Sequence, residues 1–439
     1  MRNPVLLLII LLTLSCKQEK ATTSTLFTNK IDSLLTIKEK NTAFMGSIYI
    51  SSNGNKVYEK AIGFEDVEAN RKSNLNTQYN IGSISKTFTA VLVMKAVEEN
   101  KLQLNETIQQ YFPMIKNADK ITIKQLLQHR SGVHSFTKDK AFWETRTQYV
   151  SSEEMLLRIS KYGSDFEPNA KSEYSNSNYF LLARILEKIY ETSYEELLQN
   201  KICSPLNLKN TYSEKNTNTQ CHSYTYGNKW MKFAPTSLSV GIGSGSIIST
   251  TRETNHFLES LLRGSVVSEN SLQEMKTIKS EYGLGLVEYT LNDRTGYGHR
   301  GHIDEFRATA IYFPKENLSF TMISNGSKED INILYQEIFK LYCNDAPVKA
   351  DPKKVKLFTG TYTSSKTKTD QIVFINENNA LVHIIKNEYK CPLVYKGNNQ
   401  FILEQMYATN IKFIFTDDGK ELTFEQGNFK EKYIKNEEI

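Results

Sequence analysis

The sequence predicts a mixed α/β chain in two parts, a large domain over residues 28–345 and a small antiparallel β domain over residues 355–439. The chain has 439 residues, more than a single ordinary hydrophobic core usually organises. Helix-like and strand-like patterns are mixed as far as residue 343. A stretch with two prolines and several lysines then predicts a linker at residues 346–354. Beyond it the apolar runs are short and bounded by turns, which is typical of strands.

The N-terminus has the pattern of an export signal. In "MRNPVLLLIILLTLSC" an arginine precedes an apolar run that is too short to span a bilayer but suits a signal peptide over residues 1–15. The Thr-Leu-Ser-Cys ending resembles a bacterial lipobox, in which the cysteine is lipidated and becomes the new N-terminus. We therefore expect a lipid on Cys16, a polar tether over residues 16–27, and a protein anchored to the lipid bilayer of the cell envelope, on its periplasmic or cell-surface face. An ordinary cleaved signal peptide with an incidental cysteine is the alternative.

The first elements are expected to be a surface helix, a hairpin and a buried helix. "TNKIDSLLTIKEK" has apolar residues at helical spacing. "FMGSIYIS" and "KVYEKAIGF" flank an Asn-Gly turn at residues 52–55, which predicts a β-hairpin. From Ser83 to about Asn100 the pattern is helical and apolar on several sides, as in a central helix. "ITIKQLLQHRSGV" then predicts a short helix that ends at Gly132.

The middle of the chain combines an irregular insert with further helices. Residues 136–170 are polar and aromatic with little periodicity apart from the helical "SSEEMLLRIS", and a long irregular insert is often a lid that faces a substrate. "SNSNYFLLARILEKIYE" and "TRETNHFLESLL" predict helices. The glycine-rich "SVGIGSGSIIST" lacks the strand-to-helix setting of a dinucleotide site, so we expect a tight loop at the edge of a cleft.

The remaining segments predict strands and one closing helix. "EYGLGLVEYT", "GYGHRGHIDEFRATAIYF" and "LSFTMISN" have strand character, and "INILYQEIFKLYC" is helical. In the β domain, "QIVFI" and "ALVHII" flank residues 376–379, and "IKFIF" and "ELTFEQ" flank residues 417–419, as in hairpins. An antiparallel set of this size predicts a small barrel or a curled sheet.

Charge and cysteine content argue against several classes of protein. The formal net charge of +5 is spread thinly, with basic and acidic residues interleaved, so no nucleic-acid partner is expected. No cysteine belongs to a C-x-x-C pair, and the histidines lie in no H-E-x-x-H motif or carboxylate cluster. We therefore expect neither a metal nor a cofactor. Cys203 and Cys221 could pair in an exported protein or remain free structural thiols, and their spacing leaves both open.

The stretch "YNIGSISKTFTA" places Ser83 and Lys86 three residues apart in an otherwise apolar run. If Ser83 begins the helix, Lys86 lies one turn on and on the same face. The helix N-terminus and partial burial both disfavour a positive charge, so the pKa of Lys86 is expected to fall. Such an amine can accept the proton of a serine hydroxyl, which is a weak nucleophile until a base activates it. Taken alone, such a motif is more often a helix-capping serine beside a solvated lysine.

Two further short motifs strengthen this interpretation. "EYSNSNY" carries Tyr174 and Asn176 at the start of a helix. A phenol beside a lysine ammonium is pushed toward phenolate, so Tyr174 could serve as a general base, while Asn176 could offer an amide donor and acceptor to a substrate amide. "YGHRGHIDEF" carries His299 and Gly301 on a predicted strand, where a glycine would let a substrate backbone approach closely.

In this order the three motifs resemble those of serine β-lactamase-related proteins, and they are most similar to class C β-lactamases, D-Ala-D-Ala carboxypeptidases, D-aminopeptidases and family esterases. The resemblance extends through "YNIGSISKTFTA", "ITIKQLLQHRSGV", "YSNSNYFLLARILE" and "YGHRGH", and it covers about residues 28–345. It implies a β-lactamase/transpeptidase-like fold, with a central antiparallel sheet flanked by helices and a helical subdomain. The C-terminal β domain lies outside these motifs.

The resemblance also implies a role for each matched residue. Ser83 would be the acylated nucleophile, and Lys86 and Tyr174 would share the proton transfer that activates it. Asn176 would hold the substrate amide. His299 would stand where many relatives have the lysine of a K-T-G motif.

The resemblance further places an oxyanion hole at the backbone N–H groups of Ser83 and His302, since the residue after the glycine of the third motif supplies one donor. The chain also departs from the family here. Relatives often have a small residue in place of His302 and a glycine in place of Glu305. These departures bear on the substrate more than on acyl-enzyme chemistry, because a backbone donor survives a change of side chain.

We therefore predict an exported serine hydrolase that forms an acyl-enzyme at Ser83. Its substrates would be small-molecule or peptide amides or esters, such as peptides related to the cell wall. A β-lactamase proper is one alternative, although no motif reports the fast deacylation that it needs. A catalytically inactive protein that binds cell-wall fragments is the other.

Overall fold

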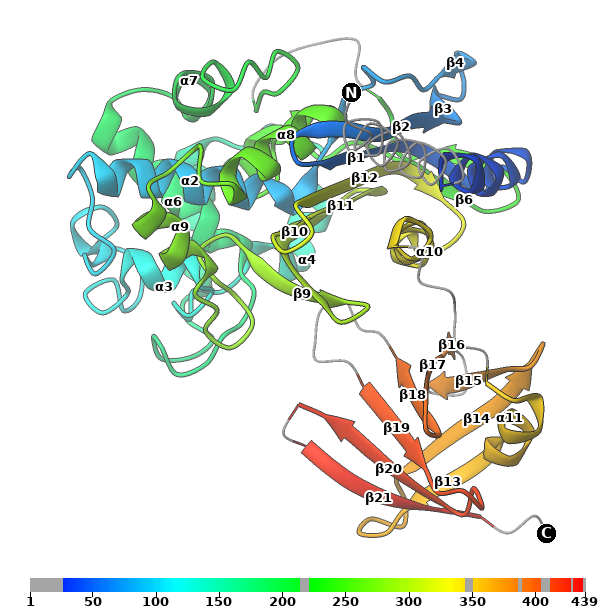
Figure 1. Cartoon of the computed structure of the whole chain (residues 1–439). Helices are drawn as coiled ribbons and strands as arrows, with labels where there is room; N and C mark the ends of the chain where they lie inside the picture. Colours follow the sequence, from blue (N-terminus) through cyan, green and yellow to red (C-terminus); the bar gives the residue numbers. More distant parts are fainter. Residues whose placement is uncertain are drawn as a thin grey trace, which may run out of the picture. The chain divides into compact units, whose positions relative to one another are not determined.

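The computed structural model describes residues 27–213, 221–343, 350–385, 389–403, 411–427 and 429–436 (Figure 1). The predicted signal peptide, Cys16 and nearly all of the tether lie outside these ranges. Within them, no helix is long and apolar enough to cross a membrane. The chain divides into two compact units, Met1–Tyr289 with Arg294–Ile338 and Thr290–Asp293 with Phe339–Ile439.

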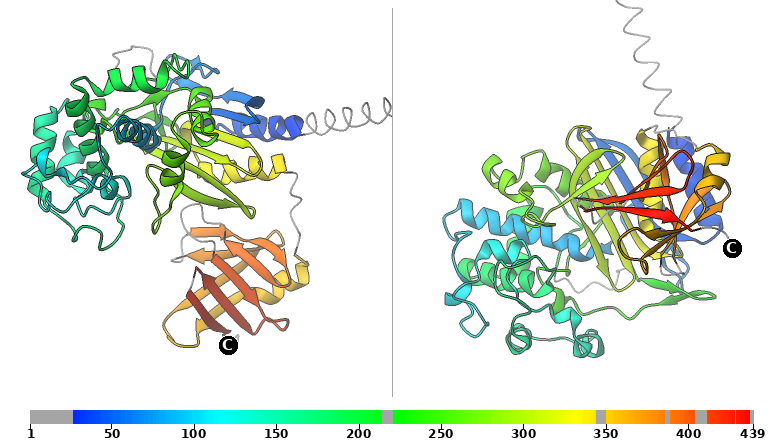
Figure 2. Two further views of the ribbon diagram at one scale, coloured as in Figure 1. Left: turned by 60° about the vertical axis from the view of Figure 1, so that its left-hand side comes forward. Right: turned by 90° about the horizontal axis from the view of Figure 1, so that it is seen from below.

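A six-stranded sheet forms the centre of the first unit, with strand order β2-β1-β12-β11-β10-β9 (Figures 1 and 2). The pairs β2–β1, β1–β12, β12–β11 and β11–β10 are antiparallel. The predicted central antiparallel sheet and the first hairpin are therefore confirmed. The strands are β1 (Phe44–Ser52), β2 (Asn55–Ile62), β9 (Val287–Leu291), β10 (Arg294–Ile303), β11 (Phe306–Phe313) and β12 (Leu318–Ser327).

Helices cover both faces of this sheet. Successive residues of a strand point to opposite sides, so two adjacent residues of β12 contact a different helix each. On one face, the Thr321 hydroxyl of β12 accepts a hydrogen bond from Asn255 of α8 (Thr251–Leu262) at 3.3 Å. On the other, the neighbouring Phe320 stacks on Tyr335 of α10 (Ile331–Cys343), with ring centroids 4.0 Å apart. The sheet is thus the middle layer between helices, as Figure 1 shows.

The predicted central helix begins with a 3₁₀ turn, η1 (Gly82–Ile84), and continues as α2 (Ser85–Glu98). Every residue of α2 from Ser85 to Met94 is buried, which confirms the expectation drawn from its apolar pattern. Phe88 of α2 stacks on Phe257 of α8 at 3.5 Å between ring centroids. The helix α6 (Asn176–Tyr190) packs against α2, so the start of α6 reaches the neighbourhood of Ser83.

Backbone geometry explains where two predicted elements end or begin differently. The predicted helix up to Gly132 is shorter, since α3 (Ile123–Leu127) ends before His129, whose φ of 54° is left-handed and incompatible with a continued helix. The predicted strand "EYGLGLVEYT" begins only at Val287, after Gly285 with φ of 72°.

Shorter elements connect these layers. A helix covers residues 27–40. The other helical pieces of the first unit are η2 (Ile108–Gln110), η3 (Phe136–Lys138), α4 (Lys140–Thr145), α5 (Ser152–Tyr162), α7 (Tyr194–Leu198), η4 (Gln199–Cys203), η5 (Leu238–Gly241) and α9 (Glu269–Lys276). The short strands are β3 (Phe64–Asp66), β4 (Arg71–Lys72), β5 (Tyr79–Asn80), β6 (Tyr224–Tyr226), β7 (Trp230–Lys232) and β8 (Ile248–Ser249).

The second unit contains one nine-stranded sheet, with strand order β16-β15-β14-β13-β21-β20-β19-β18-β17. Its two edge strands, β16 and β17, are consecutive in the chain with only Leu393 between them, so the sheet must curl until its edges approach. The predicted curled sheet is confirmed. Its strands are β13 (Gly360–Ser364), β14 (Gln371–Glu377), β15 (Ala380–Ile385), β16 (Tyr389–Pro392), β17 (Val394–Gly397), β18 (Gln400–Leu403), β19 (Ile411–Phe415), β20 (Glu421–Gln426) and β21 (Phe429–Lys435).

One helix in the second unit was not expected from the strand-like pattern. Asp351 caps α11 (Pro352–Phe358) by accepting a hydrogen bond from the backbone N–H of Lys353, and a proline occupies the first helical position, which suits proline. Val355 and Phe358 of this helix are fully buried in the core of the curled sheet.

The cysteines are free thiols within the described part of the chain. Cys203 and Cys221 are buried and unbonded to each other. Burial raises the pKa of the Cys221 thiol well above its ordinary value, as expected of an inert structural thiol. Their spacing left open a disulfide or two free structural thiols, and the structure shows the free thiols.

Candidate active site

Short strands hold the Ser83 turn in place. Tyr79 and Asn80 of β5 pair with β8, and the next residue, Ile81, donates its backbone N–H to the carbonyl of Ile247 at 3.0 Å. The Asn80 side chain then accepts a hydrogen bond from the Gly82 N–H at 2.8 Å. Ser83 follows in the 3₁₀ turn and is only partly buried, so its hydroxyl is presented at the edge of the core.

Two glycines bring this turn into direct contact with β10. A Cβ at Gly82, where φ is 52°, would lie 2.7 Å from the backbone nitrogen of His302. A Cβ at Gly301 would lie 1.9 Å from the carbonyl oxygen of Ile81. The reason predicted for Gly301 is therefore corrected, because the chain segment beside it is the protein's own Ser83 turn and not a substrate. The two predicted oxyanion-hole residues, Ser83 and His302, are neighbours as a result.

The side chain of Lys86 is fully buried and makes three polar contacts. Its Nζ lies 3.1 Å from Ser83 Oγ, 2.7 Å from Asn176 Oδ1 and 2.7 Å from the backbone carbonyl oxygen of Ser244. The side chain has 0% exposure. The alternative of a solvated lysine beside a helix cap is therefore wrong, and the predicted pairing of the serine with the lysine is present.

The surroundings of Lys86 favour its neutral form. Burial lowers the pKa of the Lys86 amine well below its ordinary value, as was predicted. Its two shortest contacts are with acceptors, an amide oxygen and a carbonyl oxygen. A neutral amine has two N–H groups for these acceptors and one lone pair left for the Ser83 hydroxyl. The geometry therefore matches an amine that can receive a proton from Ser83.

Tyr174 lies next to this pair, but the predicted shift toward phenolate is wrong in direction. Burial of the hydroxyl raises the pKa of Tyr174 well above its ordinary value, and a hydrogen bond with Ser83 opposes this rise only in part. The Lys86 amine lies over the face of the tyrosine ring, 4.8 Å from its centroid. Tyr174 is accordingly a neutral phenol within hydrogen-bond reach of Ser83.

Asn176 is the first residue of α6, and both ends of its side-chain amide have partners. Its Oδ1 accepts from Lys86, and its Nδ2 donates to Thr137 Oγ1 at 2.9 Å. Its backbone N–H donates to Ser135 Oγ at 3.0 Å. An amide still has one acceptor lone pair and one N–H beyond these contacts, so a substrate could share it.

His299 on β10 is uncharged. It is buried, its Nδ1 lies 2.6 Å from the backbone carbonyl oxygen of Arg300, and burial lowers its pKa to about 3. Because a carbonyl can only accept, Nδ1 carries the proton and Nε2 is an acceptor. The third motif thus places a neutral imidazole where many relatives have a lysine.

His129 is a further buried imidazole beside the site. Its Nδ1 accepts a hydrogen bond from the backbone N–H of Ser175 at 3.1 Å, and its ring lies 4.4 Å from that of Tyr174. Burial lowers its pKa well below the ordinary value. His129 therefore has a packing role and supports the backbone just before Asn176.

A cleft of about 250 Å³ opens at Ser83. Of the predicted site residues, Ser83, Asn176 and His302 line it, while Lys86, Tyr174, His299 and Gly301 are not among its lining residues. The other lining residues come from the irregular insert, the glycine-rich loop and the turn after β10: Phe136, Thr137, Phe142, Trp143, Thr236, Val240, Gly241, Ser244, Gly245, Ile303 and Asp304. The predicted glycine loop at the cleft edge is confirmed, and the irregular insert lies where a lid was predicted.

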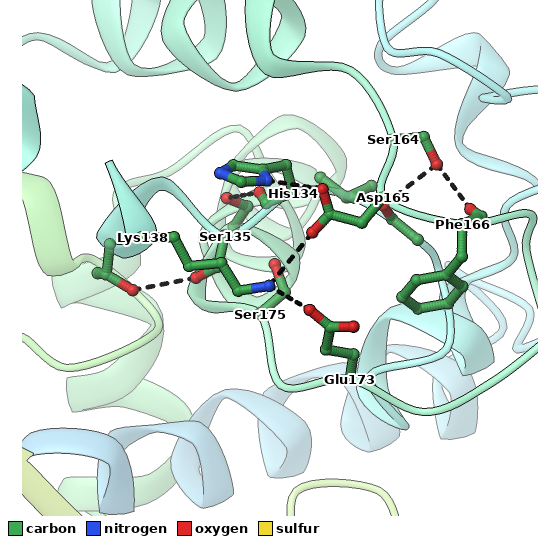
Figure 3. A network of polar contacts seen from close by, with 12 residues as sticks. His134, Ser135, Lys138, Ser164, Asp165, Phe166, Glu173 and Ser175 are labelled. Atoms are coloured by element: carbon green, nitrogen blue, oxygen red, sulfur yellow. Dashed lines mark hydrogen bonds and ion pairs between the residues drawn. The ribbon is translucent and has the colours of Figure 1, made fainter. Parts of the chain in front are cut away.

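The insert is tied to the rest of the domain by a charged network close to Asn176 (Figure 3). His134 Nδ1 lies 2.7 Å from a carboxylate oxygen of Asp165. Lys138 forms ion pairs with Asp165 and with Glu173, as the dashed lines in Figure 3 show. Ser135, which receives the Asn176 N–H, belongs to the same turn, so this network positions the start of the lid against α6.

Sequence reasoning missed two partners of the site, Thr137 and the carbonyl of Ser244. A backbone carbonyl leaves no trace in residue identity, and Thr137 lies in a segment without periodicity. The glycine-rich stretch around Ser244 predicted a loop at the cleft, but it did not predict the contact between the Ser244 carbonyl and Lys86.

Comparisons with known proteins agree with this geometry. The family model described as Beta-lactamase matches residues 37–340. A curated relative, the teichoic acid D-alanine hydrolase of Staphylococcus aureus strain MRSA252, is 28% identical over 323 residues, which is 71% of this chain and 77% of that protein.

Two solved structures share the fold. The D-amino acid amidase from Ochrobactrum anthropi SV3 superposes with a TM-score of 0.65 at 20% identity, over 74% of this chain and 99% of that one. The octameric penicillin-binding protein homologue from Pyrococcus abyssi has a TM-score of 0.66 at 23% identity, over 93% of this chain and 99% of that one.

Proposed function

This chain belongs to the Beta-lactamase family and is a serine hydrolase, and from that premise we propose that it cleaves esters or amides of small D-amino acids through an acyl-enzyme at Ser83. The observation that carries the proposal is the pairing of a buried Lys86, whose pKa burial lowers, with Ser83, beside a cleft whose described lining includes an aspartate but neither lysine nor arginine.

The acylation step follows from the contacts of Lys86. The neutral amine takes the proton of Ser83 as Oγ attacks the substrate carbonyl carbon. The resulting oxyanion is held by the backbone N–H groups of Ser83 and His302. The proton then passes to the leaving oxygen or nitrogen by way of the Tyr174 hydroxyl, the carbon–leaving-group bond breaks, and the Ser83 ester remains. Water releases the acid by the reverse proton path.

Electrostatics of the cleft argue for substrates without a carboxylate in the part that enters the cleft. The imidazole of His299 is neutral, so the third motif offers no cation. Neither lysine nor arginine occurs among the described lining residues. A substrate carboxylate would therefore enter without the charge-assisted partner that makes such contacts strong.

The same cleft suits an ammonium group. Asp304 lines it, whereas the partner of Asp304, Arg146, is not a lining residue. The acidic member of the ion pair, and not the basic one, is thus the one that lines the cleft. A D-alanyl ester carries an ammonium group and no free carboxylate, and the curated relative is named as a hydrolase of D-alanine on teichoic acid. These observations together support D-alanyl esters as the favoured substrate.

We expect the enzyme to discriminate against an added carboxylate. With N-acetyl- and N-succinyl-D-alanine methyl ester, which differ by a carboxylate at the acyl end, kcat/KM should be about 10- to 100-fold lower for the succinyl compound, because an unpaired charge costs about 1.5–3 kcal/mol. Steady-state hydrolysis at fixed ionic strength measures the ratio. D-alanine methyl ester should be hydrolysed faster than either.

Three outcomes would argue against this proposal. A higher kcat/KM for benzylpenicillin than for D-alanine methyl ester would identify a β-lactamase proper. Equal rates for the acetyl and succinyl esters would contradict the electrostatic argument. Absence of turnover with every ester, amide and lactam, together with no adduct at Ser83, would support the alternative of a catalytically inactive protein that binds cell-wall fragments.

We further propose that this activity is located at the cell envelope, with Cys16 as the lipidated residue. The support is the export pattern of residues 1–16 and a relative named for an envelope polymer. Expressed at full length, the wild type should partition into the detergent phase of a Triton X-114 separation, and Cys16→Ser should move to the aqueous phase. A wild type found in the aqueous phase with an intact Cys16 would rule out the lipid anchor.

A further inference from the structure

The lid helix α4 covers one side of the cleft but contributes almost nothing to the core. None of its residues is buried, and the indole of Trp143 is 57% exposed. Yet Phe142 and Trp143 both line the cleft, with their rings 5.4 Å apart. Phe142 is partly buried against the core, and the Trp143 indole N–H donates to the carbonyl of Thr137 at 3.1 Å. Because burial holds so little of this short helix, the contacts near its two ends help to set its position.

The N-terminal end is held by Phe136 and by the surface network of Figure 3. Phe136 is buried and packs on Phe142 at 5.4 Å between ring centroids. Lys138 of the network is substantially exposed to solvent, with 42% side-chain exposure. Ion pairs at such positions are weak and are screened by salt.

The C-terminal end is held by a buried ion pair. Arg146, the residue after α4, lies 3.0 Å from Asp304 Oδ1, and the two side chains are only 10% and 5% exposed. The same guanidinium donates to the carbonyl of Ala234 at 2.6 Å and stacks over Phe233 at 4.6 Å. Asp304 in turn accepts hydrogen bonds from both the backbone N–H and the hydroxyl of Thr236.

This ion pair connects the lid to the strand that bears the proposed oxyanion hole. Asp304 follows β10 directly, two residues after His302, and its φ of 52° is a conformation that aspartate and asparagine tolerate. The contacts of the Asp304 carboxylate with Arg146 and Thr236 therefore lie at the rim of the cleft.

We propose that the Arg146–Asp304 pair is a specificity-determining device, which fixes Phe142 and Trp143 close to Ser83 and thereby limits the size of the acyl group that the cleft accepts. The proposal rests on the hydrolase function given above. Arg146 is a positioning residue, since it acts through the aromatic side chains of the lid. Asp304 also lines the cleft, and it positions these side chains through Arg146. Loss of the pair frees the C-terminal end of α4 and widens the cleft.

The test compares the hydrolysis of D-alanine and D-phenylalanine p-nitroanilide, which have the same leaving group. In Arg146→Ala and Asp304→Asn, the ratio of kcat/KM for D-phenylalanine over D-alanine should rise at least about tenfold above wild type, as expected where a few methylene groups decide the fit. Arg146→Lys, which keeps the charge but cannot reach all the partners, should lie between. Lys140→Ala, which breaks an exposed ion pair with Glu144 in the same helix, is the matched control and should leave the ratio unchanged.

Hydrogen–deuterium exchange of residues 140–148 gives a second readout that needs no activity. Exchange should be faster in Arg146→Ala and Asp304→Asn than in wild type and in Lys140→Ala. If the wild type hydrolyses neither the anilides nor the methyl esters of these two amino acids, the proposed function fails while exchange still decides the anchoring; if only the esters are hydrolysed, the same ratio is measured with them. An unchanged ratio, or unchanged exchange, in folded Asp304→Asn or Arg146→Lys would overturn the proposal, even if Arg146→Ala fails to fold.

Discussion

Replacement of Ser83 by alanine should abolish hydrolysis of every substrate that the wild type cleaves. Without Oγ no acyl-enzyme can form, and kcat should fall by about 10⁴-fold or more, the scale seen when a covalent nucleophile is removed. The fold should persist, because the side chain is only partly buried and the turn is held by the backbone contacts of Ile81 and Gly82. Steady-state hydrolysis and thermal unfolding measure the two quantities.

The matched control for this variant is Ser265→Ala, a change of the same size at an exposed serine after α8. It should keep the activity of the wild type. If Ser83→Ala retained more than about a tenth of the wild-type kcat while Ser265→Ala behaved normally, the loss would be far below what removal of a nucleophile causes, and Ser83 would not carry the acyl group.

Replacement of Lys86 by methionine should lower kcat/KM by about 10³-fold, within the range that a general base contributes. Methionine has a similar length and is apolar, so it suits a side chain that is fully buried. Lys95→Met on the same helix removes an amine that donates to the carbonyl of Val266 and is the control, with activity close to wild type. Equal effects of the two variants would show that Lys86 acts only through the stability of α2.

The pH dependence of the wild type should carry the signature of Lys86. Activity requires the neutral amine, so kcat/KM should rise with pH through the lowered pKa of Lys86 and reach its plateau well below the ordinary lysine pKa. Lys86→Met should lack this acid limb. Tyr174→Phe should keep it at a reduced rate, because the raised pKa of Tyr174 leaves its phenol protonated throughout. Loss of the limb in Tyr174→Phe alone would make Tyr174 the base.

The stability of the fold should also depend on the protonation of Lys86. Between the lowered pKa in the folded state and the ordinary pKa in the unfolded state, the unfolded chain holds a proton that the folded chain lacks. The contribution of Lys86 to the free energy of unfolding therefore increases as pH rises through this window, and the destabilisation is complete below the folded-state pKa. Denaturant unfolding of wild type and Lys86→Met at several pH values measures this difference.

Most of the site residues were predicted from short sequence motifs. Ser83, Lys86 and Asn176 were found because residue type and spacing encode the chemistry, and the structure places them within hydrogen-bond distance. Their helices were also predictable, since α2 is a long segment that is apolar on several sides and α6 is a long amphipathic segment. The centre of the glycine-rich stretch was predictable as a loop because glycine permits tight turns, while η5 and β8 occupy its two ends.

Features that depend on two distant segments were not readable in the same way. The motif of Gly301 suggested room for a substrate, but the space is taken by Ile81, which a sequence cannot place there. The direction of the pKa of Tyr174 depends on how deeply its hydroxyl is enclosed. The pairing of Arg146 with Asp304 joins an irregular insert to a turn. Tertiary packing, not local pattern, decides each of these.

The most direct test of the account is the mass of the protein caught during turnover. Wild type mixed with an excess of D-alanine methyl ester and quenched in acid should carry one added D-alanyl group on the peptide that contains Ser83, and Ser83→Ala should carry none. Hydrolysis that proceeds without such an adduct, including under rapid quench, or an adduct on another residue, would contradict the acyl-enzyme at Ser83.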